Sequence, residues 1–136
     1  MITYTTSLDG ITPDKLRGFF VGWTTPPSPE THLRLLRNSS HLVLAVDDET
    51  GSVVGFVTAV SDHVLSASIS LLEVLPQYRS RGVGAELVRR ILEEVGDLYM
   101  IDFVCNPAMQ PFYTRLGMRP STGMMRRNPK RQSGAE

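Results

Sequence analysis

The most regular hydrophobic pattern in the chain lies between residues 83 and 95. Apolar side chains recur there at intervals of three and four residues, at Val83, Leu87, Val88, Ile91, Leu92 and Val95. This spacing places them on one face of an α-helix. Glutamate and arginine residues four positions apart occupy the other face, where such pairs stabilise a helix. Gly96 predicts the end of this helix.

Five shorter apolar or β-branched runs predict strands. They cover Ile2–Thr6, His41–Val46, Ser52–Ser61, Ser66–Val74 and Leu98–Val104. The second and third runs are separated by a turn that ends at Gly51, which predicts a hairpin. Gly55 within the third run predicts a bulge or a close approach of another element. The last run is almost continuously apolar, so we expect a strand that is covered on both faces.

Helix-start residues predict two helices between the first and second strands. Thr12-Pro13 begins a helix that we expect to reach Phe20 or Trp23. Ser28-Pro29 begins another, which we expect to end near Asn38.

A short helix and a candidate strand are predicted near the C-terminus. Gln110 caps a helix over Pro111–Leu116, and Gly117 ends it. Met124–Arg127 is a candidate last strand. The order β-α-α-β-β-β-α-β-α-β predicts one α/β domain of mixed α+β character over residues 1–127, followed by a disordered tail over residues 128–136.

The composition limits which binding partners and which cellular compartment we expect for this protein. The chain has 14 basic and 14 acidic residues, so its net charge attracts neither nucleic acid nor a membrane, and we expect neither as a partner. We interpret the basic residues between Arg115 and Arg131 as a solubilising tail, with contact to nucleic acid as the alternative. Cys105, the single cysteine, excludes an internal disulfide and a zinc cluster. The sequence shows no signal peptide and no apolar run of roughly 18–20 residues, so we expect a cytoplasmic protein.

The loop before the regular helix carries the main chemical signal. Residues 79–84 read Arg-Ser-Arg-Gly-Val-Gly and lead directly into the helix. Free N–H groups at a helix N-terminus, glycines and arginines together favour a phosphate ligand. Gly84 is followed by Ala85-Glu86, not by the Lys-Ser/Thr of a nucleoside-triphosphate loop. Leu87 occupies the position where a dinucleotide-binding fold needs a small residue.

The pattern Arg-x-x-Gly-x-Gly over residues 79–84 resembles the acyl-CoA-binding signature of the GNAT superfamily of N-acyltransferases. A second signature of that superfamily has its counterpart in Asn106, which follows an apolar strand, and Tyr113, seven residues later. This segment closes on Met118, where the family typically has phenylalanine. The resemblance covers about residues 43–118. Two short segments, 71–76 and 110–113, are similar to a small subgroup of uncharacterised bacterial members.

The resemblance implies a GNAT-like fold, in which a central mixed sheet with splayed parallel strands is flanked by helices. It also implies acetyl-CoA as cosubstrate, with no metal. Its pyrophosphate would lie beside Arg79 on the backbone N–H groups at Arg81, Gly82, Val83, Gly84 and Ala85.

The resemblance further implies where the reacting end of acetyl-CoA lies. The pantetheine arm would run between strands 66–74 and 98–104, with the backbone amides around Leu72 and Val74 directed at the thioester carbonyl. Asn106 would steady the pantetheine or cap the following helix. Tyr113 would donate a proton to the departing thiolate.

The sequence leaves the proton acceptor for the attacking amine open. Family members that use a glutamate place it a few residues earlier on this strand, where this chain has Ser68 and Ser70. Glu73, the only carboxylate on the strand, is the first candidate. Asp102 and a water chain are the alternatives.

We therefore expect an N-acetyltransferase that transfers an acetyl group to a primary amine by direct attack in a ternary complex. The alternative is a catalytically silent CoA-binding module. Trp23–His32, the strand face of Glu73 and the segment around Met124 are expected to bound the acceptor site. A small cationic amine and a peptide N-terminal or lysine amine fit these residues equally well. We also expect a homodimer through the last strand or a helix face.

Overall fold

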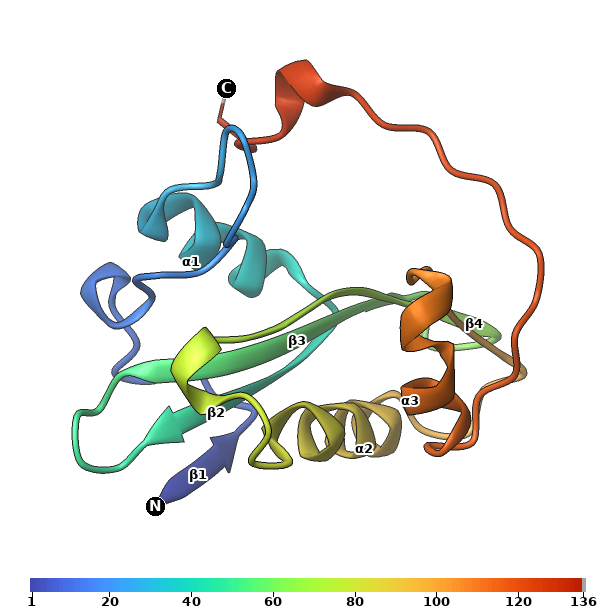
Figure 1. The fold of residues 1–136 in the computed structure, drawn as a ribbon, viewed down its shortest axis with the longest axis horizontal. Coiled ribbons are helices and arrows are strands. Elements are labelled where there is room, and N and C mark those ends of the chain that lie inside the picture. Colours follow the sequence, from blue (N-terminus) through green and yellow to red (C-terminus); the bar gives the residue numbers. More distant parts are fainter. Residues whose placement is uncertain (136) are drawn as a thin grey trace.

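The structure is a computed structural model that describes residues 1–135. A single sheet has the strand order β1-β2-β3-β4-β5, antiparallel except between β4 and β5. Its strands are β1 (Ile2–Thr5), β2 (His41–Asp47), β3 (Val53–Ser61), β4 (Ser66–Val74) and β5 (Met100–Phe103). The sheet lies between α1 (Pro29–Asn38) on one face and α2 (Val83–Val95) on the other (Figure 1). This mixed sheet flanked by helices confirms the predicted fold class.

The helix predicted from hydrophobic spacing is α2, which has the predicted bounds. Its residues Val83, Leu87, Val88, Ile91 and Val95 are buried. A Cβ atom at Gly55 of β3 would lie 3.0 Å from Leu87 Cδ1 and 3.3 Å from Val83 Cγ1. The expected close approach at Gly55 is therefore confirmed, and it brings α2 tightly against the middle of the sheet.

An aromatic cluster fills the opposite face of the sheet, beneath α1. His32 of α1 lies with its ring centroid 4.4 Å from that of Phe56 in β3, and Phe19 and Phe20 pack around both. Ser28 caps α1 as predicted, because its side chain accepts a hydrogen bond from Thr31 N.

The first predicted helix is wrong. Only a 3-10 turn, η1 (Pro13–Lys15), forms after Thr12. Gly18, Phe20 and Gly22 have φ angles of +90°, +63° and +84°. A right-handed helix cannot contain such left-handed residues, so the chain instead forms a loop over residues 16–23.

Strands β4 and β5 pair over only part of their length. Their ladder runs from Ser66 opposite Met100 to Ile69 opposite Phe103. Beyond it β4 continues to Val74 paired with β3 alone. A β-bulge marks the point of divergence, because the residues opposite Thr58 and Ala59 are Leu71 and Ile69, which leaves Ser70 as the extra residue. The two parallel strands therefore splay apart after Ile69.

The prediction that the last strand is covered on both faces is wrong. In the described part of the chain β5 is an edge strand, Met100 is 41% exposed and Asp102 is exposed. Met124–Arg127, the candidate last strand, is extended and exposed and pairs with nothing in residues 1–135. Without a neighbour from this segment, one edge of β5 stays open.

The C-terminal segment crosses back to α1. After α3 (Gln110–Thr114) the chain extends away from the sheet and returns at η4 (Pro129–Arg131), so its C-terminal end lies beside α1 (Figure 1). Residues 128–135, expected to be a disordered tail, are described in contact with α1 and the loop before it: Thr25 N donates to Gln132 Oε1 at 2.7 Å, and Arg34 Nη2 donates to Gly134 O at 2.6 Å. Glu136 lies outside the described residues. No helix in residues 1–135 has the length and apolarity needed to cross a membrane.

Candidate active site

The splayed end of β4 offers backbone groups without a strand partner. Leu75 N donates to Val54 O at 2.8 Å, so that amide points toward β3. Backbone groups alternate in direction along a strand, and the amides of Leu72 and Val74 therefore point away from β3. The ladder to β5 has already ended at Ile69. These two amides are thus directed into the opening between the strands.

The N-terminus of α2 lies at the end of the same opening. Its N-cap, Gly82, has φ +79°, and no side chain caps the helix. The first helical hydrogen bond joins Glu86 N to Gly82 O, so the amides of Val83, Gly84 and Ala85 have no partner within the helix. Free amides at the positive end of a helix dipole make a site for an anion.

The two arginines of the loop are held by different groups. Arg79 Nε donates to Val74 O at 3.0 Å, which fixes it against the last residue of β4. The Arg81 guanidinium lies over the Tyr78 ring, 5.2 Å from its centroid. Tyr78 in turn donates to Asp47 Oδ2 at 2.6 Å and thereby lowers the pKa of that carboxyl. Both arginines are exposed and lie at the α2 N-terminus, so the loop adds positive charge to the anion site.

Tyr113 connects the end of β5 with this helix terminus. It is 7% exposed, and its ring centroid lies 4.5 Å from that of Phe103, the last residue of β5. The next side chain, Phe112, packs 4.8 Å from Tyr113 and reaches within 3.8 Å of the position of a Cβ atom on Gly84. Burial raises the pKa of Tyr113 to about 12, with a further contribution from Cys105. The phenol is therefore protonated at neutral pH and can act as a proton donor.

The helix that carries Tyr113 begins one residue earlier than predicted. Gln110, expected to be the cap, is the first residue of α3, and the 3-10 turn η3 (Pro107–Met109) precedes it. Asn106 is exposed at the start of that turn and makes no side-chain capping hydrogen bond. Its carboxamide therefore has no capping role in the described structure.

Glu73 lies on the opposite face of β4 from Leu72 and Val74. It is paired with Phe56, whose ring belongs to the aromatic cluster beneath α1. Its carboxylate accepts hydrogen bonds from Phe20 N at 2.8 Å and Val21 N at 3.2 Å. Phe20 has the left-handed φ that is rare for a large side chain. Glu73 thus holds the loop over residues 16–23 in its unusual conformation.

A small pocket opens between this loop and β4. We call it the inner pocket; its volume is about 230 Å³. It is lined by Phe20, Val21, Trp23, Phe56, Leu71, Leu72, Glu73 and Arg79. Because Leu72 belongs to its wall, the inner pocket adjoins the splayed strand end from the α1 face. A molecule bound in the inner pocket would therefore lie next to a group bound between β4 and β5.

The family model for acetyltransferases of the GNAT family matches residues 8–118. The chain belongs to the GNAT acetyltransferase family. A solved structure of a proposed acetyltransferase from Deinococcus radiodurans is 48% identical, with a TM-score of 0.96 over 99% of this chain and 94% of that one. A GNAT-family acetyltransferase from Streptococcus pneumoniae is 26% identical, with a TM-score of 0.75 over 94% of this chain and 98% of that one.

A curated relative in the GNAT family is an uncharacterised N-acetyltransferase from Pyropia yezoensis. It is 26% identical over 101 residues, which are 71% of this chain. The chain spans 58% of the length of that relative.

The GNAT signatures predicted from the sequence meet in one place. The loop over residues 79–84, the free amides of Leu72 and Val74 and the ring of Tyr113 surround the opening between β4 and β5. Asp102 lies on β5 and is exposed, and Cys105 is partly buried just beyond that strand. Met124, expected near the acceptor site, is fully exposed and lines neither the inner pocket nor the larger one described below.

Sequence reasoning missed two parts of this candidate site. The backbone amides of Phe20 and Val21 hold Glu73, and no residue type signals an interaction through backbone atoms. The C-terminal residues 131–134 reach the same face of the sheet. The basic character of that segment was visible in the sequence, but its contact with α1 was not.

Proposed function

We propose that this protein transfers an acetyl group from acetyl-CoA to a primary amine by direct attack in a ternary complex. The observation that carries the proposal is the common opening that the free β4 amides, the uncapped α2 N-terminus and Tyr113 share. An acyl-CoA has a pyrophosphate for the helix N-terminus and a thioester for the strand amides, joined by an arm that fits an open strand edge.

The residues of the chain have distinct parts in this reaction. The amides of Val83, Gly84 and Ala85, with Arg79 and Arg81, bind the pyrophosphate. The neutral amine attacks the thioester carbon, and an amide of Leu72 or Val74 donates a hydrogen bond to the oxygen as negative charge develops there.

Breakdown of the tetrahedral intermediate releases the amide product and the CoA thiolate. Tyr113 donates its phenolic proton to the departing sulfur, and the raised pKa keeps that proton in place at neutral pH. Asn106, exposed and without a capping bond, is available to the pantetheine arm.

Glu73 is the carboxylate that we place nearest the reacting amine. It lies in the wall of the inner pocket beside Leu72. Each of its oxygens accepts one backbone hydrogen bond, and a carboxylate oxygen has room for a second. Glu73 therefore receives a proton from the amine while it holds the loop; a chain of water molecules to bulk solvent is the alternative route.

Release of free thiol from acetyl-CoA in the presence of a panel of amines tests the proposal. We expect amine-dependent thiol release, and we expect Tyr113→Phe to lower kcat while the affinity for CoA stays the same. Tyr99→Phe is the matched control, because Tyr99 is 85% exposed and lies outside the site. Tight CoA binding without turnover of any amine would instead favour the silent CoA-binding module.

A further inference from the structure

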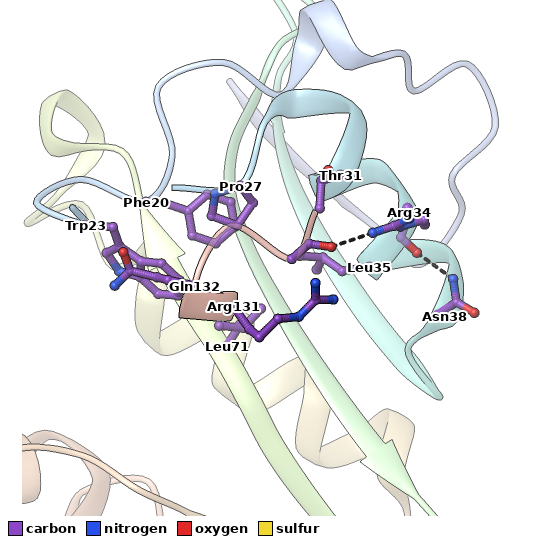
Figure 2. A pocket seen from close by; sticks show the side chains of 11 residues that line it. Phe20, Trp23, Pro27, Thr31, Arg34, Leu35, Asn38, Leu71, Arg131 and Gln132 are labelled. Atoms are coloured by element: carbon purple, nitrogen blue, oxygen red, sulfur yellow. Dashed lines mark hydrogen bonds between the residues drawn. The ribbon is translucent and has the colours of Figure 1, made fainter. Parts of the chain in front are cut away.

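A larger pocket lies next to the inner pocket on the α1 face of the sheet. We call it the outer pocket; its volume of about 340 Å³ lies in the range of small-molecule sites. The two pockets share Phe20, Trp23 and Leu71. Figure 2 shows the outer pocket between α1 and the returning C-terminal segment. A molecule that extends from the inner pocket past these three shared residues would enter it.

The walls of the outer pocket combine apolar surface with positive charge. Phe20, Trp23, Pro27, Leu35 and Leu71 supply the apolar part. Among residues 1–135, Arg34 and Arg131 are the charged residues of the lining, and no aspartate or glutamate belongs to it. Glu73, the one carboxylate that the described residues place in the lining of either pocket, lines the inner one. The positive charge is thus separated from Glu73 by an apolar stretch.

Arg131 has hydrogen-bonding capacity left for a ligand. Its Nη1 donates to Ala135 O at 2.5 Å, while its Nε and Nη2 make no hydrogen bond to residues 1–135. Its side chain extends from η4 toward α1 across the pocket (Figure 2). A guanidinium presents several donors in a plane, an arrangement that matches a carboxylate.

The C-terminal residues 131–134 pack closely enough against α1 to form one wall of the outer pocket. Gln132 accepts a hydrogen bond from Thr25 in the loop before α1, and Gly134 accepts one from Arg34 in the middle of α1. A Cβ atom on Gly134 would lie only 3.1 Å from Thr31 Cγ2, and Gly134 has φ +66°. Glycine therefore permits the close contact that positions Arg131.

We propose that the acetyl acceptor is a primary amine whose apolar body ends in an anionic group, and that Arg131 binds this group in the outer pocket. The inference rests on the proposed transferase function, with the amine at Leu72 and Glu73 in the inner pocket. The apolar body lies along Phe20, Trp23 and Leu71. A cationic acceptor body, which the sequence allowed equally well, would meet the Arg131 guanidinium, and the lining residues within 1–135 supply no carboxylate to bind it.

Two matched amines test this inference through binding as well as turnover. One is 4-(2-aminoethyl)benzoate, and the other is its neutral carboxamide, 4-(2-aminoethyl)benzamide. Calorimetry with the CoA-loaded full chain gives Kd, and thiol release gives kcat/KM. Because a charge-assisted hydrogen bond is involved, we expect the benzoate to bind about tenfold more tightly than the benzamide. Arg131→Gln should remove this difference, whereas Arg126→Gln, on the exposed arm away from the pocket, should preserve it.

The outcomes separate this inference from the proposed function. Equal binding of the two amines, binding of neither, or an unchanged preference in Arg131→Gln would overturn the anionic-acceptor inference even if some other amine is acetylated. Binding of the benzoate that depends on Arg131, without thiol release from any amine, would support the anion site and contradict the transferase function.

Discussion

Protonation of His32 should destabilise this protein at mildly acidic pH. His32 is fully buried, and neither ring nitrogen has a hydrogen-bond partner in the described residues. The rings of Phe19, Phe20 and Phe56 surround it, and no acidic side chain within residues 1–135 offsets the effect of burial on its pKa. Burial lowers the pKa of His32 from 6.5 to about 4. The unfolded chain therefore binds this proton at higher pH than the folded chain does.

The sign and size of the effect follow from linkage. The contribution of neutral His32 to stability is fully present above pH 6.5 and is lost as the pH falls toward 4. Between pH 8 and pH 5 these two pKa values correspond to a loss of about 2 kcal/mol in the free energy of unfolding. Glu86 and Asp62, whose pKa values are lowered to about 2, contribute mainly below this range because their unfolded pKa values are 4.5 and 3.8.

Urea unfolding at pH 8, 7, 6 and 5 measures this loss. Trp23 is the single tryptophan, and its ring lies 4.9 Å from Phe20, so its fluorescence reports on this region. His32→Leu is the comparison variant, because it removes the titrating group and keeps an apolar side chain. The wild type should lose about 2 kcal/mol more than His32→Leu between pH 8 and pH 5. A parallel decline of the two proteins would refute the assignment.

Three further substitutions test individual parts of the structure. Gly82→Ala places a side chain on a left-handed backbone position at the α2 N-cap, so the free energy of unfolding should fall by about 1–2 kcal/mol, measured by denaturation. The CoA affinity, measured by calorimetry, should fall as well. An unchanged CoA affinity would argue against the anion site. Glu73→Gln keeps a hydrogen-bond acceptor for Phe20 N but loses the charge. The kcat should therefore fall at least tenfold, on the scale of general acid–base catalysis, while the Kd of CoA stays constant. An unaltered kcat would instead favour a chain of water molecules as the proton acceptor. Ser28→Ala removes the cap of α1 and should cost about 1 kcal/mol in urea unfolding. Ser121→Ala is the control, because Ser121 is exposed and lies outside any helix; equal stability of both variants would contradict the role of the cap.

The parts of the fold that the sequence predicted well are those specified by local pattern. The apolar spacing of α2, the residues Ser28-Pro29 at the start of α1 and the run of β4 each define an element from neighbouring residues. The position of the loop over residues 79–84 was predictable for the same reason, since its glycines and arginines directly precede α2.

The parts that the sequence did not predict depend on distant contacts. The loop over residues 16–23 has helix-start residues, yet Glu73, more than fifty positions away, binds the amides of Phe20 and Val21. The last strand looked fully buried because its residues are apolar, although no neighbour covers it in the described chain. The wall formed by Arg131 requires Gly134 to contact Arg34 across 100 positions. Long-range pairings of this kind leave no periodic trace in a sequence.

The most direct test of the proposed donor site is an amide NMR titration of the ¹⁵N-labelled protein with acetyl-CoA. Binding in the opening between β4 and β5 predicts that the largest shifts occur at the amides of Leu72, Val74 and residues 83–85, with smaller changes at His63 and Val64 in the β3–β4 turn, at the other end of β4. Saturable shifts confined to other parts of the sheet, with these amides unmoved, would contradict the account.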